Sequence, residues 1–225
     1  INYFYTKDKN GKKYKVIITP PYTLIENFSK IFKNKKILIG AQNCFQKDRY
    51  SSDTGAVSSF MIKNVGAKYT LIGHSDNRAA GDNDKILKEK VKSALKNNLK
   101  IVFCIGENKL EKKKKKTLII LKKQITKVLD KKLDKNNIII AYEPIWSIGT
   151  GKIPNPRELQ RTIGYIKKLL KTIFGKKSPP VLYGGSVDAN NVYVFKQNKE
   201  IDGFLIGGAS KSSKKFIDII KNYYR

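Results

Sequence analysis

The chain alternates short apolar runs with longer stretches in which apolar residues recur at helical spacing. Apolar runs of about four to eight residues, bounded by Gly, Pro, Asn or charged residues, are typical of buried strands. The expected strands are Tyr14–Thr19, Ile37–Asn43, Tyr69–Gly73, Ile101–Gly106, Ile138–Glu143, Val181–Gly184 and Gly203–Ile206. Apolar residues three or four apart are typical of amphipathic helices. The expected helices are Leu24–Phe32, Ser58–Val65, Asp84–Leu95, Thr117–Leu133, Pro156–Phe174, Asn191–Phe195 and Lys214–Tyr223.

Strands that alternate with helices predict an α/β fold, and strands that are apolar on both faces predict a parallel sheet covered by helices. Seven strand–helix units follow one another, whereas a (β/α)8 barrel needs eight and usually spans about 250 residues. We therefore expect one domain over residues 1–225, a (β/α)8 barrel whose first β-α unit is absent or degenerate, with an irregular segment at residues 1–13. Because the first residue is Ile1 rather than Met, we expect a missing upstream segment. A doubly wound sheet is the alternative, but no Gly-x-Gly-x-x-Gly follows the first strand.

The net charge of +29 is typical of a nucleic-acid-binding protein. Arg, which forms the bidentate contacts that recognise bases and phosphates, supplies only five of the 47 basic residues. The lysines are spread along the chain among many Asn, Ile and Tyr residues, which favours drift toward AT-rich codons. We expect no specific nucleic-acid partner, only weak binding to polyanions at low salt.

The sequence also bears on membrane association and redox compartment. There is no run of about 18 apolar residues, so no membrane span is expected, and no signal peptide is visible. Cys44 and Cys104 lie in or beside strand-like runs and are interpreted as reduced core residues of a cytoplasmic protein. His74 is the only histidine, which argues against a zinc site.

The stretch from Ile138 to Lys152 carries the most distinctive chemistry. Glu143 stands at the carboxyl end of an apolar strand, which Pro144 ends because proline cannot donate to a strand ladder. The loop that follows has an apolar tip and a Gly-Thr-Gly exit. This composition suits a lid that closes over a base and excludes water. An ordinary strand with an acidic turn is the alternative.

Other candidate groups also follow the expected strands, at the edge where a barrel builds its active site. They are Asn43, His74, Glu107, Gly184-Gly185-Ser186 and Gly207-Gly208-Ala209-Ser210. Backbone N–H groups of glycine loops bind phosphate, and the last two strand loops are the usual phosphate site of barrels. A pair of tight turns is the alternative. His74 suits a neutral imidazole that donates a hydrogen bond to a substrate oxygen, although a lone histidine is commonly structural.

Six ordered segments of the chain resemble the triosephosphate isomerase family. They are Ala41–Cys44, Ile72–Ser75, Cys104–Glu107, Ala141–Lys152, Tyr183–Val187 and Asp202–Ser210. The resemblance covers the chain from about Tyr14 to its end and implies a TIM barrel. It implies a cytoplasmic homodimer, formed through the Thr54-Gly55 loop, that interconverts dihydroxyacetone phosphate and D-glyceraldehyde 3-phosphate in glycolysis and gluconeogenesis. It also implies that no cofactor and no metal are needed.

The resemblance assigns a role to each site residue. Glu143 would be the base that moves a proton between two substrate carbons through an enediolate, and His74, neutral near a helix N-terminus, would polarise the carbonyl. The residues that would hold the phosphate are Gly149, Ser186, Gly207 and Gly208. The lid would comprise Pro144, Ile145, Trp146, Ser147, Ile148, Thr150, Gly151 and Lys152.

The chain departs from the family at its start. The family opens with Asn-Trp-Lys-Met-Asn, whose Lys supplies positive charge to the substrate, and this segment has no clear counterpart here. The acidic residues of the family's His-Ser-Glu and Thr-Gly-Glu are replaced by Asp76 and Ala56. We therefore expect low turnover from residues 1–225 alone. Two alternatives stay open: a non-catalytic barrel relative that binds phosphates or polyanions, and a basic nucleic-acid-binding domain of barrel ancestry.

Overall fold

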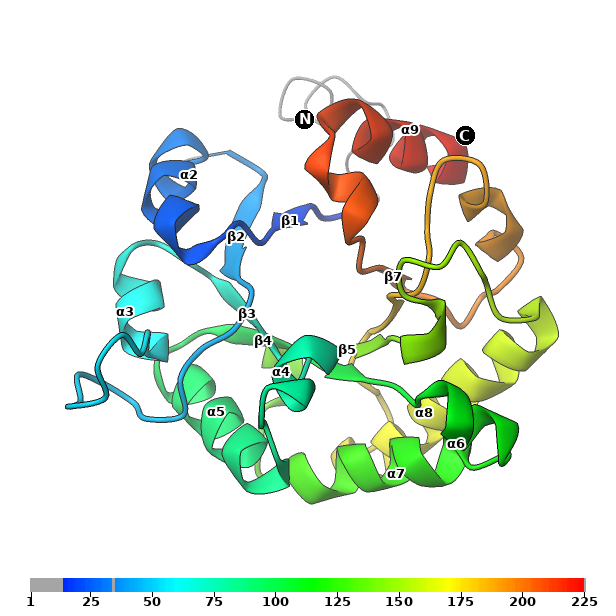
Figure 1. The fold of residues 1–225 in the computed structure, drawn as a ribbon, viewed down its shortest axis with the longest axis horizontal. Coiled ribbons are helices and arrows are strands. Elements are labelled where there is room, and N and C mark those ends of the chain that lie inside the picture. Colours follow the sequence, from blue (N-terminus) through cyan, green and yellow to red (C-terminus); the bar gives the residue numbers. More distant parts are fainter. Residues whose placement is uncertain (1–13, 34, 225) are drawn as a thin grey trace. The chain divides into compact units, whose positions relative to one another are not determined.

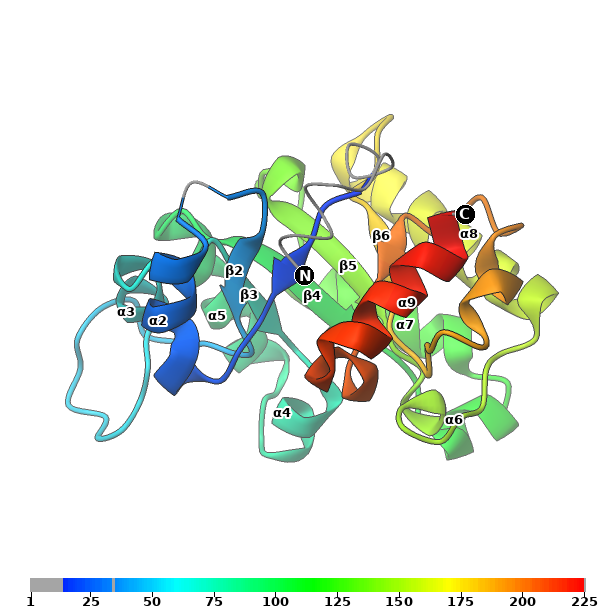
Figure 2. The same cartoon turned by 90° about the horizontal axis from the view of Figure 1, so that it is seen from above.

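In the computed structural model, residues 14–33 and 35–224 are described. They fall into two compact units, Ile1–Phe103 and Cys104–Arg225. Within each unit, parallel strands alternate with helices (Figure 1, Figure 2). The expected irregular segment at residues 1–13, and with it the expectation that the first β-α unit is absent or degenerate, lies outside the described residues. The expectation of one domain over residues 1–225 stays a prediction.

The strands of the first unit pair in parallel and in chain order. They are β1 (Ile17–Ile18), β2 (Leu38–Ala41), β3 (Tyr69–Ile72) and β4 (Lys100–Ile105), the last of which crosses the boundary between the units. The helices are the 3-10 helix η1 (Tyr22–Leu24), α2 (Ile25–Ile31), α3 (Ser59–Asn64), α4 (Ser75–Ala79) and α5 (Asp84–Lys96). All four residues of β3 are buried, as expected for a parallel strand with both faces covered. Helix α5 packs on β3 and α3, with Leu87 and Val91 fully buried.

The second unit repeats this pattern with strands β5 (Ile138–Tyr142), β6 (Val181–Tyr183) and β7 (Gly203–Phe204), which are parallel. Its α-helices are α6 (Lys109–Lys113), α7 (Thr117–Val128), α8 (Pro156–Phe174) and α9 (Ser213–Tyr224). Its 3-10 helices are η2 (Lys135–Asn137), η3 (Ile145–Ser147), η4 (Val192–Phe195) and η5 (Gly208–Lys211). Helix α8 packs on α7 and β6, and its buried face includes Leu159, Ile163, Ile166 and Leu170.

Most expected elements are present in the structure, and the differences have local causes. Helices α4 and α6 were not expected, because neither five-residue segment has an apolar face. The 3-10 helix η4 replaces the expected short helix. Helix α7 ends at Val128 rather than Leu133, because Leu129 is extended. Strands β1 and β7 have only two residues each.

The strands bring the candidate groups to their carboxyl ends within each unit. Asn43 and His74 follow β2 and β3 in the first unit, and Glu143 and Gly184 come directly after β5 and β6 in the second. Among the described residues, no helix combines the length and apolar character needed to cross a membrane.

Candidate active site

Glu143 is a nearly buried carboxylate, 5% exposed, at the end of β5. Its backbone N–H donates to the Ile105 carbonyl at 2.8 Å, which fixes the chain where the strand ends. Two glycines lie against it. A Cβ on Gly184 would lie 2.5 Å from the Glu143 Cγ, and a Cβ on Gly106 would lie 1.8 Å from its carbonyl oxygen. Only glycine allows this close approach at positions 106 and 184. The backbone at these two glycines therefore limits where the Glu143 carboxylate can lie.

A second carboxylate, Glu107, holds the start of the lid. It is fully buried and accepts hydrogen bonds from Trp146 Nε1 at 2.8 Å and from the Tyr142 hydroxyl at 3.2 Å. Its carbonyl accepts from the Ile145 N–H at 3.0 Å. Burial raises the pKa of the Glu107 carboxyl above its ordinary value, and the hydrogen bonds from Trp146 and Tyr142 oppose this only in part. The sequence placed Glu107 at a strand end but gave it no role.

The lid is tied to the loop after β6 by two serine hydroxyls. Ser186 Oγ accepts from the Gly151 N–H at 3.0 Å and donates to the Ser147 carbonyl at 2.6 Å. Ser147 Oγ, fully buried, donates to the Lys152 carbonyl at 2.5 Å and lies 3.1 Å from the Tyr183 hydroxyl. The middle of the lid, at Ser147, and its end, at Gly151 and Lys152, are therefore fastened beside Ser186. Burial raises the pKa of Tyr183 to about 12, so this hydroxyl stays neutral.

The glycine loops differ in what their backbone amides can offer. The Gly184 N–H donates to the Tyr142 carbonyl at 2.9 Å, and the Ser186 N–H points at Ser147 Oγ at 3.3 Å. Gly207 and Gly208, in contrast, are exposed, and no acceptor for their N–H groups occurs among the described residues. Of the expected phosphate-holding residues, Ser186 alone has its backbone amide bonded, and the N–H groups of Gly149, Gly207 and Gly208 have no acceptor among the described residues. Gly149, in the lid, is exposed with a left-handed φ of 67°.

His74 is the residue that caps helix α4 at its N-terminus. Its Nδ1 accepts a hydrogen bond from the Asp76 N–H at 3.3 Å. This bond assigns the imidazole proton to Nε2, the nitrogen that can then donate to a substrate oxygen. Gly73, directly before it, has a φ of 80°, which turns the chain from β3 into α4.

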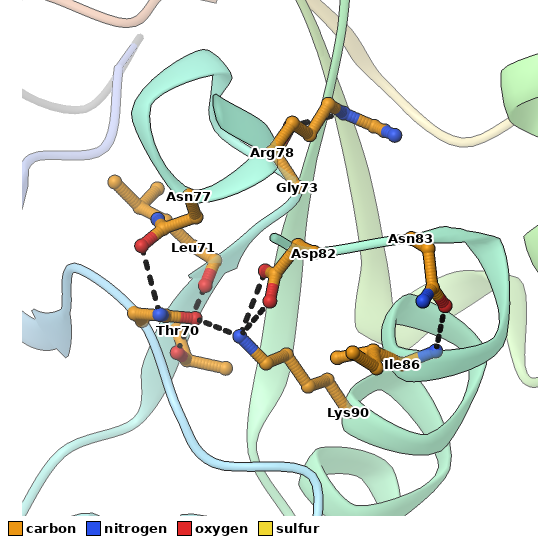
Figure 3. Close-up of polar contacts among 10 residues, drawn as sticks. Thr70, Leu71, Gly73, Asn77, Arg78, Asp82, Asn83, Ile86 and Lys90 are labelled. Carbon is orange, nitrogen blue, oxygen red and sulfur yellow. Dashed lines mark hydrogen bonds and ion pairs between the residues drawn. The ribbon is translucent and has the colours of Figure 1, made fainter. Parts of the chain in front are cut away.

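Sequence reasoning missed a polar network in the first unit that joins Asn43 to Lys90, Asp82 and Asn77; Figure 3 shows the last three. Lys90 Nζ donates to the Asp82 carboxylate at 2.7 and 2.8 Å and to Asn43 Oδ1 at 3.0 Å. Asn43 Nδ2 donates to Asn77 Oδ1 at 2.9 Å. One signal was available in the sequence. Lys90 lies four residues after Ile86 and three after Leu87, so a charge falls on the apolar stripe of its helix.

Each unit therefore gathers part of the expected site. The second holds Glu143, the lid from Pro144 to Lys152, and Ser186 in one connected group. The first holds His74 at the start of α4, whose Asn77 is bonded to Asn43. Parallel strands with such groups after their carboxyl ends are the arrangement of (β/α)-barrel enzymes, and fold and site place the chain in this class.

Comparison with known proteins names the family within that class. A family model described as triosephosphate isomerase matches residues 1–223. The triosephosphate isomerase of Saccharomyces cerevisiae is 38% identical over 211 residues, which cover 92% of this chain and 84% of that protein. The one from Thermodesulfovibrio yellowstonii is 37% identical over 219 residues, 96% of this chain and 88% of that protein. The crystal structure of triosephosphate isomerase from Bartonella henselae superposes with a TM-score of 0.87 at 33% identity, covering 94% of this chain and 87% of that one.

The chain belongs to the triosephosphate isomerase family. The expected α/β TIM barrel is confirmed by the likeness to the Bartonella enzyme, and the resemblance seen in the sequence is confirmed by the family match. The non-catalytic and nucleic-acid-binding alternatives have no support from these relatives, which all carry the isomerase name.

Proposed function

We propose that this chain interconverts dihydroxyacetone phosphate and D-glyceraldehyde 3-phosphate, as an intramolecular aldose–ketose isomerase of glycolysis and gluconeogenesis. The observation that carries the proposal is the buried Glu143 carboxylate directly before a lid that is held at its start by Glu107 and at its end by Ser147 and Ser186. A buried, precisely held base and a loop that excludes water suit proton abstraction beside a carbonyl.

Glu143 and His74 divide the chemistry between them. The Glu143 carboxylate takes a proton from the carbon beside the substrate carbonyl, while the Nε2 proton of His74 stabilises the charge that develops on the carbonyl oxygen. The product is an enediolate. Glu143 then returns its proton to the neighbouring carbon. At the oxygens, His74 Nε2 gives its proton to the former carbonyl oxygen and takes up the proton of the enediolate hydroxyl, which completes the exchange of aldose and ketose with no net change in atoms or electrons. No cofactor enters these steps.

The phosphate and lid assignments follow from the backbone and hydroxyl groups nearby. Gly207 and Gly208 offer exposed N–H groups at the start of η5, which suit an anion. Ser186 and Gly149 lie at the lid and would complete the phosphate contact when the lid closes. A closed lid also protects the enediolate, because water would allow it to expel the adjacent phosphate.

The test of the base is Glu143→Gln, which keeps the shape of the side chain and removes its basicity. We expect kcat to fall by about 10²- to 10⁴-fold, as is typical for loss of a general base. Glu89→Gln, the same change at an exposed position on α5, is the control and should keep full activity. Unchanged turnover by the Glu143→Gln enzyme in a coupled assay for aldose–ketose interconversion would exclude this role.

The test of the lid is Ser186→Ala, which removes the hydroxyl bonded to Gly151 and Ser147. Loss of two hydrogen bonds at about 1 kcal/mol each would lower kcat/KM by roughly tenfold or more. Thr172→Val, which removes a hydroxyl at an exposed position of α8, is the control. Equal kcat/KM values for the two variants would remove Ser186 from the lid mechanism.

We also propose a cytoplasmic homodimer formed through the Thr54-Gly55 loop. This loop has an exposed tip at Thr54 and Gly55, and Tyr50 beside it is 72% exposed, an unusual state for a large aromatic side chain. Sedimentation velocity should give the mass of two chains for the parent and of one chain for Tyr50→Ser. Cell fractionation checks the compartment.

A further inference from the structure

Among the described residues, Lys90 is the only lysine that is buried, with 4% of its surface exposed. It lies on α5, and its ammonium is held by both oxygens of Asp82 (Figure 3). It also donates to Asn43 Oδ1. Its partner Asp82 is only 11% exposed at the side chain. Burying an ion pair costs desolvation free energy, so the Lys90–Asp82 pair is weak evidence that these residues stabilise the fold. A role in positioning neighbouring groups accounts for the pair better.

The network has a fixed direction. An ammonium group can only donate hydrogen bonds, so Asn43 must turn its oxygen toward Lys90. This leaves the Asn43 NH2 group facing Asn77, whose oxygen accepts at 2.9 Å. The charge on Lys90 therefore selects one of the two orientations of the Asn43 amide. Hydrogen bonds that share polar groups, as these do at Asn43, polarise and strengthen one another.

Asn77 belongs to the short helix α4, whose N-cap is His74. A second tether reaches the same helix start, because Arg78 Nε donates to the Gly73 carbonyl at 2.7 Å (Figure 3). The turn after α4 is closed by the Asp82 N–H, which donates to the Asn77 carbonyl at 3.0 Å. A helix of five residues has little stability of its own, so these contacts decide where His74 stands.

We propose that Lys90 is a positioning residue for the isomerase reaction, which acts through Asn43 and Asn77 to fix α4 and with it the His74 imidazole. The inference rests on the proposed role of His74. It adds that a charge remote from the substrate sets the orientation of the group that polarises the carbonyl.

A pair of substitutions at Asn77 tests the last link. Asn77→Asp keeps an oxygen that accepts from Asn43, whereas Asn77→Leu has a similar size and accepts nothing. We expect the Asp variant to keep kcat within about twofold, and the Leu variant to lose about tenfold in kcat with little change in KM, the size of one hydrogen bond to a charge-oriented group. Equal kcat for the two variants would overturn the proposal.

A second variant tests Lys90 itself without leaving a buried charge. Lys90→Met combined with Asp82→Asn removes both charges, and Lys92→Met, at an exposed position on the same helix, is the control. We expect the paired change to lower kcat about tenfold, and to add nothing further when combined with Asn77→Leu. Additive losses would mean that Lys90 and Asn77 act separately and would overturn the relay.

NMR separates failure of this inference from failure of the proposed function. His74 is the only histidine of the 225 residues, so the imidazole signals in a ¹H–¹⁵N spectrum belong to one group. They should shift in Asn77→Leu and in the Lys90/Asp82 variant, and stay in place in Lys92→Met. Unmoved signals would overturn the positioning role whatever the activity. Shifted signals with unchanged turnover would support the positioning and refute the catalytic role of His74.

Discussion

Gly184 is the position where the smallest possible substitution should disable the base. A methyl group there would lie 2.5 Å from the Glu143 Cγ and 3.0 Å from its Oε1. Carbon atoms in contact are about 3.5 to 4 Å apart, so the Glu143 side chain would have to move by about 1 Å. The Gly184 backbone cannot retreat easily, because its N–H donates to the Tyr142 carbonyl at 2.9 Å.

A displacement of this size has a large expected effect on a base. Misplacing a catalytic group by about 1 Å can cost about 10²-fold in rate, or about 2.7 kcal/mol of barrier. We therefore expect Gly184→Ala to lower kcat about 100-fold. The atoms met by the new methyl group belong to a side chain, which can turn aside, so folding should survive. Only the productive position of the carboxylate is lost.

Two other glycines provide the controls. Gly164→Ala lies within α8 with open space around it, so it should keep full activity and stabilise the helix by about 1 kcal/mol. Gly106→Ala would place its methyl group 1.8 Å from the Glu143 carbonyl oxygen. That contact is with backbone, so this variant should fail to fold rather than lose turnover selectively.

The measurements are kcat and KM from a coupled assay, with the unfolding temperature recorded for each variant. A Gly184→Ala enzyme with an unchanged unfolding temperature and a kcat within threefold of the parent would refute the reasoning. It would show either that Glu143 is not the base or that its position at Gly184 is irrelevant to the reaction.

Three further predictions concern stability and reactivity. Burial raises the folded-state pKa of Glu107, so ionisation of this carboxyl destabilises the fold increasingly as pH rises above the unfolded-state pKa. In urea unfolding from about pH 4 to 7, the Glu107→Gln variant should therefore become more stable relative to the parent as pH rises. Burial raises the pKa of the Cys44 thiol to about 12, so a thiol reagent at neutral pH should modify it only after unfolding. Ile163→Ala, in the fully buried face of α8, should cost about 2 to 5 kcal/mol in the free energy of unfolding.

The elements that could be predicted were those whose ends are marked by capping residues, prolines or glycines in the local sequence. Helix α8 was predicted over its full observed range. Asn155 accepts from the N–H groups of Arg157 and Glu158, Pro156 stands at the first helical position, and Gly175 ends the helix with a φ of 87°. These are signals that need no tertiary contact.

The helices that were not predicted lie in segments without apolar periodicity and are held by polar contacts instead. Helix α6 exposes 59% of Leu110 and is formed by a capping box, in which Asn108 and Glu111 bond each other's backbone. The Asn-x-x-Glu spacing was visible in the sequence but did not precede an apolar run. Helix α4 is held by hydrogen bonds within residues 73–78 and by the bond from Asn43 to Asn77.

The candidate site was predictable to the same degree. Glu143 and the glycine pairs were found because they follow strands, a position that the alternation of strands and helices reveals. The tie between Ser147 and Ser186 could not be found, because it joins residues 39 positions apart through hydroxyl groups that are common on any surface. Proximity of this kind is a property of the fold and not of local spacing.

The lysines show why charge alone was a poor guide to function. A chain with net charge +29 has many cations to offer, and most described lysines are exposed, where screening makes an individual charge worth little. Lys90 differs from them by its burial and its three hydrogen bonds rather than by its charge. A lysine removed from water must have each N–H matched, and the groups that match it lose their freedom to turn. The importance of a lysine for function in this protein therefore depends on which groups it holds in place, and the structure is needed to identify those groups.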